Sequence, residues 1–291
     1  MPSVAATTLI QRTRRFLGDW PDTDATTASL ASNGTSVTVA SSAVTRGYFE
    51  NQVIQIGTEA LRVTAVAATT LTVRRGQFGT TAASAASGSS ILMSPRFLDV
   101  EYLDGLSAGI DNTWPLIYKP WEDETLTAAS DTYQYTIPSM VSDSTVYPHV
   151  SEVWVRDAST LPWQRFRQWR IRHTAAGVPE LLLRAPIDTG NSIMLKGFGP
   201  FPRLGSFTDS TDAQFPRQAE WPLIEYAASW LLESGEARRV VVDRGVIDNR
   251  EQATRVGASM QVSSALLQRF LRKIEGIMPP MPGYPHVVPP L

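Results

Sequence analysis

The sequence predicts an α+β fold, with a helical bundle core, a small inserted β-barrel or β-sandwich, a second β-sandwich-like domain and an extended C-terminal arm. Three observations predict it. Apolar residues recur at helical spacing near the start, in the middle and towards the end of the chain. Two long stretches between them alternate apolar and polar residues in short runs bounded by turn residues, as antiparallel strands do. The final stretch, residues 278–291, contains six prolines and favours an extended chain.

These patterns divide the chain into five parts. The helical core is assembled from separated segments, and each β-domain is an excursion from it. The predicted boundaries are 1–24 and 94–124 for the first parts of the core, 25–93 for the inserted β-domain, 125–212 for the second β-domain, 213–276 for the C-terminal part of the core, and 277–291 for the arm.

The N-terminal segments show both periodicities. A short helix is expected over residues 5–18, where Gly18 supplies the left-handed end. Short strands are expected in the inserted domain at 35–39, 52–56, 60–63 and 70–73, where Thr, Val and Ile alternate. A second helix is expected to begin with Ser94 as its N-cap and Pro95 in its first position, and to end near Pro115 or Pro120.

The second half repeats this order. Strands are expected at 133–137, 150–156, 163–171, 181–183 and 193–195. A helix follows from Pro216, with Gly235 as its stop. A capping box at 248–251 then predicts a last helix of about 27 residues, ending near Gly276. The face of this helix expected to be buried includes Met260, Ser263, Leu267, Phe270 and Ile274.

Composition excludes several classes of protein. The chain of 291 residues has 43% apolar residues and a formal net charge of −2, which indicates an ordered globular protein and not a polybasic nucleic-acid binder. The absence of cysteine excludes disulfides and thiol catalysis. We see no signal peptide at the N-terminus and no stretch approaching the roughly 18 apolar residues of a membrane span, so we expect no membrane association.

No pattern typical of catalysis stands out, and we expect neither an enzyme nor a cofactor. The three histidines, His149, His173 and His286, lie in unrelated segments, so no metal site is expected. Gly197-Phe198-Gly199 is interpreted as a loop and not as a phosphate cradle. The acidic run 122–124 could supply the paired carboxylates of a glycosidase, but a solvated acidic loop is the preferred interpretation.

One segment alternates arginines with aromatic residues and is a candidate for contacts between subunits. Such a strand could bind single-stranded nucleic acid by stacking and phosphate contacts. It could equally present the two faces of an ordinary sandwich strand, with its Arg and Trp residues as interface anchors. The candidate interface residues are Trp163, Arg165, Phe166, Arg167, Trp169 and Arg170, with Arg172 continuing the pattern.

The proline-rich arm is the second candidate for a binding function. Such a terminus can be simply disordered. Its apolar residues also suit docking into a groove on a partner, because a polyproline II segment is already extended. The candidate docking residues are Met278, Met281, Tyr284, Val287, Val288 and Leu291.

A longer pattern carries a resemblance. Residues 55–66 read QIGTEALRVTAV and residues 70–83 read TLTVRRGQFGTTAA. This pattern resembles a small β-module common in virion proteins of tailed bacteriophages. The segments 8–20 and 95–104 beside it, and 234–270 towards the end, look like the helices of head-to-tail adaptor proteins.

The resemblance implies a virion structural protein of the phage neck, between capsid and tail. It implies a ring of identical subunits, typically twelve, beneath the portal protein, with double-stranded DNA passing non-specifically through the lumen and with tail or further neck proteins as other partners. It also implies assembly in the cytoplasm of the host bacterium and an arm that reaches the portal. The alternatives are a tail-tip or baseplate protein that binds host glycan and, further from the pattern, a virion-associated hydrolase that uses residues 122–124.

Overall fold

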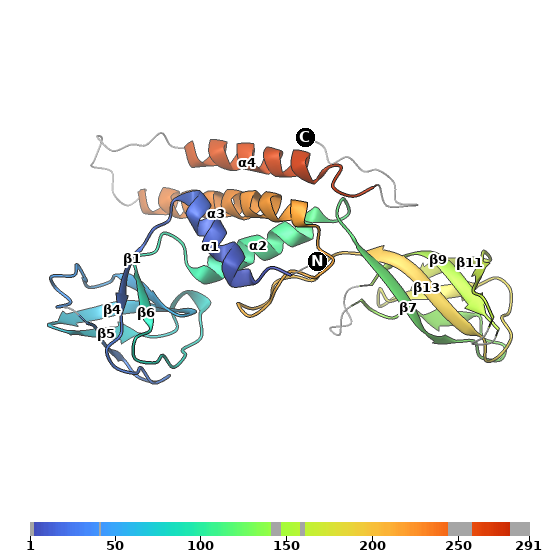
Figure 1. Ribbon diagram of the computed structural model, residues 1–291, viewed down its shortest axis with the longest axis horizontal. Helices are drawn as coiled ribbons and strands as arrows, with labels where there is room; N and C mark the ends of the chain where they lie inside the picture. The colour runs from blue at the N-terminus through green and yellow to red at the C-terminus, as the bar shows by residue number, and fades with distance from the viewer. Residues whose placement is uncertain (1–2, 41, 141–146, 158–160, 244–257, 280–291) are drawn as a thin grey trace.

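The computed structural model describes residues 3–40, 42–140, 147–157, 161–243 and 258–279 (Figure 1). Within these residues the strands form three antiparallel sheets. The elements in order are α1 (Ala6–Leu17), β1 (Asp22–Ala25), β2 (Ser36–Thr38), β3 (Val53–Ile56), β4 (Glu59–Ala67), β5 (Thr70–Arg74), η1 (Gln77–Gly79), β6 (Ser90–Met93), α2 (Asp99–Thr113), β7 (Lys119–Thr127), β8 (Gln134–Thr136), β9 (His149–Arg156), β10 (Gln164–Phe166), β11 (Trp169–His173), β12 (Pro179–Leu183), β13 (Ser192–Gly199), η2 (Arg217–Ala219), α3 (Glu220–Asp243) and α4 (Ala258–Ile274).

The prediction of a helical bundle core is wrong, because the described part of the chain is mostly β. Thirteen strands and only four α-helices are found there. Two of the larger hydrophobic clusters lie within the sheets, and the helices form a layer between the two β-domains (Figure 1). Helical periodicity is easy to detect in a sequence, whereas polar strands such as β1 and β7 carry almost no apolar alternation. The sequence pattern therefore overstated the share of the helices.

The first β-domain is a six-stranded sheet with the order β1-β6-β3-β4-β5-β2. An isolated bridge between Thr26 and Val39 connects the chain just beyond its two edge strands, so the sheet curls round on itself. Its interior holds Val37, Ile54 and Leu71 among other buried apolar residues. The strands expected from alternation are confirmed as β2 to β5, and β1 and β6 are additions that the alternation did not indicate.

A polar junction joins this domain to α1 and α2. Arg14 Nη2 lies 2.8 Å from Asp99 Oδ1, and Gln55 Nε2 donates to Asp99 Oδ2 at 2.7 Å. On the other side of Arg14, the buried Tyr102 hydroxyl donates to Asp19 Oδ2 at 2.8 Å. Residues from α1, β3 and α2 thus share one network of hydrogen bonds. Charge-assisted bonds of this kind are stronger than those between neutral groups.

The start of α2 differs from the prediction. The helix begins at Asp99 and not at Pro95, and Ser94 adopts a left-handed φ of 46°. The reason lies in the bonds that the segment makes: the backbone N–H of Arg96 donates to Asp19, and the N–H of Leu98 donates to Glu101 Oε2 at 2.9 Å. The segment before Asp99 is therefore held as a connection between the β-domain and the helix. The predicted helix at the N-terminus is confirmed as α1, with Gly18 at φ 66°.

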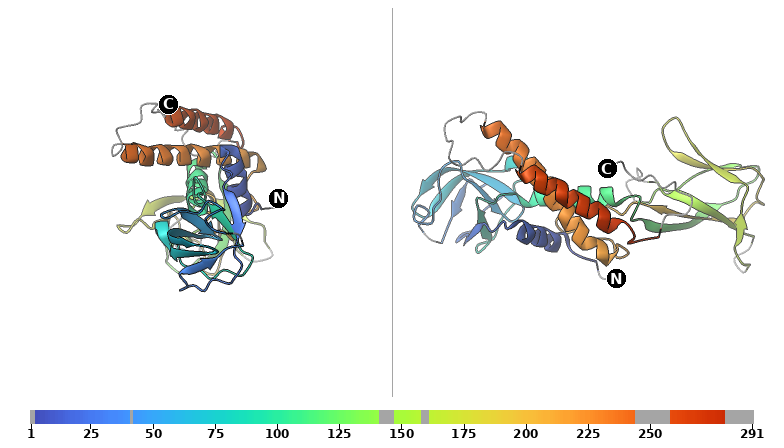
Figure 2. Two further views of the ribbon diagram at one scale, coloured as in Figure 1. Left: turned by 90° about the vertical axis from the view of Figure 1, so that its left-hand side faces the viewer. Right: turned by 90° about the horizontal axis from the view of Figure 1, so that it is seen from above.

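Helices α3 and α4 pack antiparallel across the top of the molecule (Figures 1 and 2). Ser229 and Ser263 exchange hydrogen bonds at 3.0 Å in the buried seam. Gly235 does not end α3, which continues to Asp243. A Cβ at Gly235 would lie 3.2 Å from the ring of Phe97, so this glycine serves the packing of a neighbouring aromatic side chain. The predicted capping box at 248–251 lies outside the described residues.

The second β-domain contains a four-stranded sheet, β10-β9-β13-β7, and a three-stranded sheet, β11-β12-β8. Apolar residues of both sheets form one cluster, with Val153, Leu181 and Leu195 fully buried. The two β-domains lie at opposite ends of the elongated molecule, and the helices lie between them (Figures 1 and 2).

Candidate binding cleft and interface residues

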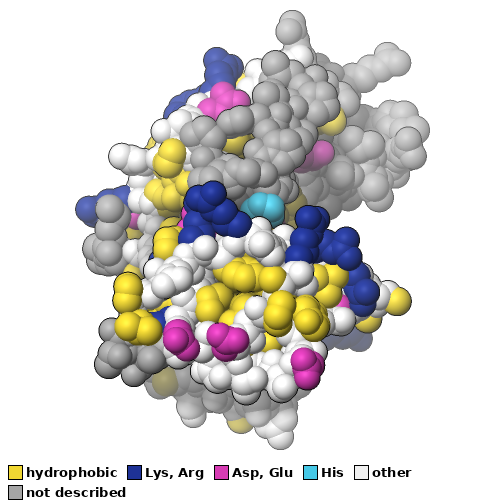
Figure 3. Space-filling view, turned by 90° about the vertical axis from the view of Figure 1, so that its right-hand side faces the viewer, with side chains coloured by type: hydrophobic (Ala, Val, Ile, Leu, Met, Phe, Trp, Pro, Cys, Tyr) yellow, Lys and Arg dark blue, Asp and Glu magenta, His cyan; other side chains and the backbone are white. Residues whose placement is uncertain are grey.

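A cleft of about 990 Å³ opens in the second β-domain, between the ends of its two sheets. Four strands line it, namely β7, β9 and β13 of one sheet and β11 of the other, together with Arg165 of β10 and Gln214 from the loop before η2. Apolar side chains gather on this end of the molecule, with basic side chains along part of their border (Figure 3). No short sequence motif could have indicated the cleft, because its walls come from five separate strands.

Gly197 forms part of the floor of the cleft. The register between β13 and β9 shifts between Lys196 and Gly197. A Cβ at Gly197 would lie 2.5 Å from the carbonyl oxygen of His149 and 3.1 Å from Cα of Val150. These are backbone atoms that cannot rotate aside, so the position requires glycine, as close backbone approaches do. The missing side chain lets β13 and β9 approach each other closely at this point.

Aromatic and aliphatic side chains form the walls. Trp121 lies on β7 directly opposite Gly197, and Trp169 and Ile171 come from β11 of the other sheet. All three are partly buried, and each packs against the core of the domain on one side. Their orientations are therefore fixed by the fold before any ligand arrives, which lowers the entropic cost of binding.

The charged residues of the cleft neutralise one another. Lys196 Nζ lies 3.1 Å from Glu122 Oε1, and Arg165 Nη2 lies 3.0 Å from Glu152 Oε1. Exposed pairs of this kind contribute at most about 1 kcal/mol to stability. The pairs matter more for the choice of ligand. The charges of the two cations balance those of the two carboxylates, so the cleft suits a ligand without net charge.

Near the mouth of the cleft, a further ion pair fixes the loop before η2. Lys119 Nζ lies 2.7 Å from Asp212 Oδ2, and the backbone N–H of Gln214 donates to Asp212 Oδ1 at 2.8 Å. Burial would raise the pKa of Asp212, but the hydrogen bonds from Lys119 and Gln214 and the positive charge of Lys119 hold that pKa below its ordinary value. The loop that carries Gln214 is thus anchored to the first residue of β7.

The structure places four of the six candidate interface residues on two different sheets, and Trp163 and Arg167 outside the strands. Arg165 and Phe166 lie on β10, whereas Trp169 and Arg170 lie on β11 of the other sheet. Phe166 and Trp169 pack against the domain core. Trp163 lies beneath the guanidinium of Arg156, whose Cζ is 4.3 Å from the ring centroid. The pattern is therefore that of two sandwich strands with apolar residues inward. Only Arg165 and Trp169 line the cleft.

The four arginines of this segment point towards solvent. Arg165, Arg167, Arg170 and Arg172 are all exposed, and Arg172 pairs with Glu180 at 3.3 Å. Because the aromatic residues between them pack into the domain, they do not offer the successive exposed rings on which bases would stack.

Two local interpretations are wrong. Residues 122–124 lie within β7, not in a loop, and their register with β13 is interrupted by a bulge between Ile193 and Leu195. Residues 197–199 likewise belong to β13. Both segments are short of β-branched residues, so alternation did not reveal them, and pairing with the apolar part of β13 and with β9 supplies their stability.

The described residues contain no group of His, Asp or Glu side chains that could hold a metal ion. His149 and His173 lie on β9 and at the end of β11, in different sheets, and His286 lies outside the described residues. The structure places Met278 of the arm against the helical cluster, where it is partly buried. Met281, Tyr284, Val287, Val288 and Leu291 lie outside the described residues.

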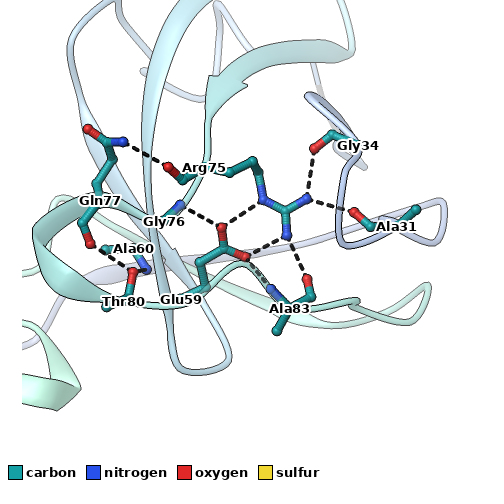
Figure 4. Close-up of polar contacts among 9 residues, drawn as sticks. All are labelled: Ala31, Gly34, Glu59, Ala60, Arg75, Gly76, Gln77, Thr80 and Ala83. Atoms are coloured by element: carbon teal, nitrogen blue, oxygen red, sulfur yellow. Dashed lines mark hydrogen bonds and ion pairs between the residues drawn. The ribbon is translucent and has the colours of Figure 1, made fainter.

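The β-module that carries the resemblance is organised around a buried ion pair (Figure 4). Arg75 Nε donates to Glu59 Oε1 at 2.7 Å, and the Glu59 carboxylate also accepts from the backbone N–H groups of Gly76 and Ala83. The remaining donors of Arg75 bind the carbonyl oxygens of Ala31, Gly34 and Ala83. Glu59 and Arg75 are thus the structural centre of the motif, since they bind three loops together.

The loop that this network supports presents an exposed aromatic residue. Phe78 has a φ of 55° and is 61% exposed, an uncommon combination for a bulky residue. Gly76 and Gly79 on either side also have positive φ, and Thr80 Oγ1 donates to Gln77 O at 2.7 Å. Strained positions of this kind occur preferentially where a side chain has a role in binding.

Helix α4 has exposed apolar residues on both sides of its buried stripe, with Met260 and Leu267 on one side and Val262 on the other. Ser263, Leu266, Phe270 and Ile274 are buried, whereas Met260, Val262 and Leu267 are between 39% and 53% exposed. The prediction that Met260 and Leu267 face the interior is therefore wrong, because Leu266 takes the inward position. Residues 258–268 include no charged side chain. Trp221 at the start of α3 is also 48% exposed.

Comparison with known proteins adds no relative. No protein-family model matches the chain, and no curated protein matches it in sequence. None of the helices that the structure describes has both the length and the apolar character needed to cross a membrane.

Proposed function

We propose that the chain is a structural subunit of a tailed-phage neck, which assembles into a ring between portal and tail through which DNA passes. In this proposal the chain acts by holding parts of the virion together and not by catalysis. The arm contacts the portal, and the β-domains reach tail or neighbouring neck proteins.

The observation that carries the proposal is the uncovered face of α4. Met260 and Leu267, which are seven residues apart and so lie on one side of the helix, project from a stretch of α4 without a single charge. Contiguous exposed apolar residues mark interaction surfaces more often than ordinary solvent-facing helix. A head-to-tail contact between identical copies closes into a ring when its rotation permits. The face therefore suits packing against a second copy of the chain.

The β-module supports the phage assignment by its sequence and its role. The Glu59–Arg75 pair of the motif holds an exposed loop in a fixed position. A fixed, exposed loop suits a subunit that contacts neighbouring proteins. The placement of the two β-domains at opposite ends of the molecule would give each ring subunit two separate contact modules (Figure 1).

The proposal is tested by determining the oligomeric state of the purified chain, alone and with portal protein, by native mass spectrometry and negative-stain microscopy. We expect rings, and we expect the double variant Met260→Asp, Leu267→Asp to remain monomeric while its circular dichroism is unchanged. The matched control is Val44→Asp, which adds a charge at another exposed apolar position, in the first β-domain. A wild-type chain that stays monomeric or trimeric with portal present would refute the proposal, as would rings unaffected by the double variant.

A further inference from the structure

We propose that the proline-rich part of the arm, residues 279–291, binds in the cleft of the second β-domain of its own chain. The inference does not rest on the proposed ring, since it concerns the isolated subunit, before the arm contacts the portal. Four observations carry it: where the described chain ends, how far the arm reaches, what the cleft walls offer, and how the charges match.

The described chain ends near the cleft. Gly276 and Ile277 line the same small hollow as Gln218 at the start of the α3 region. Gln214, at the mouth of the cleft, is only four residues earlier in the chain than Gln218, which limits their separation to about 14 Å. In Figures 1 and 2 the chain after α4 runs towards the junction between the helical layer and the second β-domain.

The arm is long enough to reach and to fill the cleft. Residues 280–291 would span about 37 Å as polyproline II, at 3.1 Å per residue. This length is more than twice the limit of about 14 Å on the distance between Gln218 and Gln214. The arm can therefore enter at Gln214 and still lie along the walls, without any movement of α4.

The walls of the cleft match the chemistry of a proline-rich segment. Such a segment has few N–H donors and leaves its carbonyl oxygens unbonded, so a partner must supply donors and flat apolar surfaces. Trp121 and Trp169 supply both. Neither indole N–H has an acceptor among the residues that the structure describes, and each ring is held by the domain core. Ile171 and Val150 add aliphatic surface.

The charges also match. Residues 277–291 contain no Asp, Glu, Lys or Arg. The cleft's Glu122 and Glu152 are already paired with Lys196 and Arg165. An arm without charged side chains can lie along the cleft and leave both ion pairs intact.

The test uses the full chain with a photo-reactive phenylalanine analogue in place of Tyr284. After irradiation, the cross-linked peptides are identified by mass spectrometry. We expect cross-links to β7, β11 and β13, and a several-fold lower yield in the variant Trp169→Ala. The matched control, Trp163→Ala, removes a tryptophan from the same domain that does not line the cleft, and should leave the yield unchanged. A mixture of ¹⁴N- and ¹⁵N-labelled chains shows whether the linked peptides come from one chain.

A second variant avoids any change to the folded domain. Replacing both Pro282 and Pro285 with Gly makes the arm flexible without touching the cleft, and should lower the cross-link yield several-fold. Cross-links only to the helical layer, cross-links only between differently labelled chains, or a yield that neither variant changes would each overturn the proposal. Retention on a polysaccharide column that Trp169→Ala abolishes, without cross-links into the cleft, would assign the cleft to a sugar and overturn it as well.

Discussion

Arg75 and Glu59 form a two-point ion pair inside the first β-domain, in which Arg75 Nε lies 2.7 Å and Arg75 Nη2 2.5 Å from the carboxylate oxygens. The side chains are only 9% and 2% exposed. Every polar atom of the guanidinium has a partner, and the carboxylate accepts two backbone N–H groups in addition. The pair is therefore a fully satisfied buried network, which makes the loss of one partner costly.

We expect Glu59→Gln to destabilise the first β-domain by about 3–5 kcal/mol, because Arg75 would remain buried without a counter-charge. Hydrogen exchange of peptides from β3 to β6, read by mass spectrometry, measures this domain separately from the others. The control is Glu50→Gln, an exposed carboxylate of the same domain, for which we expect a change within about 0.5 kcal/mol. Equal protection in both variants would show that the ion pair does not stabilise the domain.

The same carboxylate predicts a dependence on pH. Burial would raise the pKa of Glu59, but the hydrogen bonds from Arg75, Ala83 and Gly76 and the charge of Arg75 outweigh burial and lower it below 4.5. A lowered pKa in the folded state gives stability that is present above the unfolded pKa and is lost as the pH falls through the folded pKa. We expect calorimetry to show a large difference between wild type and Glu59→Gln at pH 7 and a smaller one at pH 3. A difference that grows on acidification would contradict the assignment.

At the junction between the first β-domain and the helices, we expect Tyr102→Phe to lower the free energy of unfolding by about 1.5–3 kcal/mol, since it removes a buried hydrogen bond to the charged Asp19. Chemical denaturation monitored by near-UV circular dichroism would measure the loss. Tyr133→Phe is the control, because Tyr133 is 45% exposed. Its midpoint should not change. If the two variants have the same midpoint, the hydrogen bond from Tyr102 to Asp19 makes no net contribution to stability.

We expect Gly197→Ala to destabilise the second β-domain by about 1–3 kcal/mol, because the new methyl group would force β13 away from the backbone of His149. Hydrogen exchange of β9 and β13 peptides provides the measurement. Ser192→Ala, on the same strand, is the control and should change little. Unaltered protection of β9 in Gly197→Ala would mean that the strands can separate there at no cost.

The sequence allowed several elements to be predicted, since their signals are local. Helix α1 has an apolar face and a glycine in the left-handed region at its end, and both are visible in the residues themselves. Strands β3 to β5 alternate apolar and polar residues. Each of these elements follows from neighbouring residues without reference to the rest of the chain.

The errors have a common physical cause, which is contact with distant residues. Gly235 resembles a helix stop, but the ring of Phe97 packs against it in the middle of α3. Ser94 and Pro95 resemble a helix start, but a bond from Arg96 to Asp19 holds the segment outside the helix. Strand β7 owes its conformation to pairing with β13. The predicted helical bundle core failed for the same reason, since such strands were invisible in the pattern.

The candidate sites were predicted less completely than the elements. Arginine and tryptophan alternation did single out Arg165 and Trp169, which line the cleft. It could not reveal Trp121 or Gly197, because these residues join the cleft only through the pairing of β7 with β13.

The junction built on Asp99 has a mechanical meaning for the whole molecule. Asp99 is held by Arg14 of α1 and by Gln55 of β3, and it is also the first residue of α2. A force on the first β-domain would act on α1 and α2 at the same time, because the hydrogen bonds of Asp99 connect both helices directly to β3. The first β-domain and the helical layer would therefore move together as one rigid body, and the domain would not move independently.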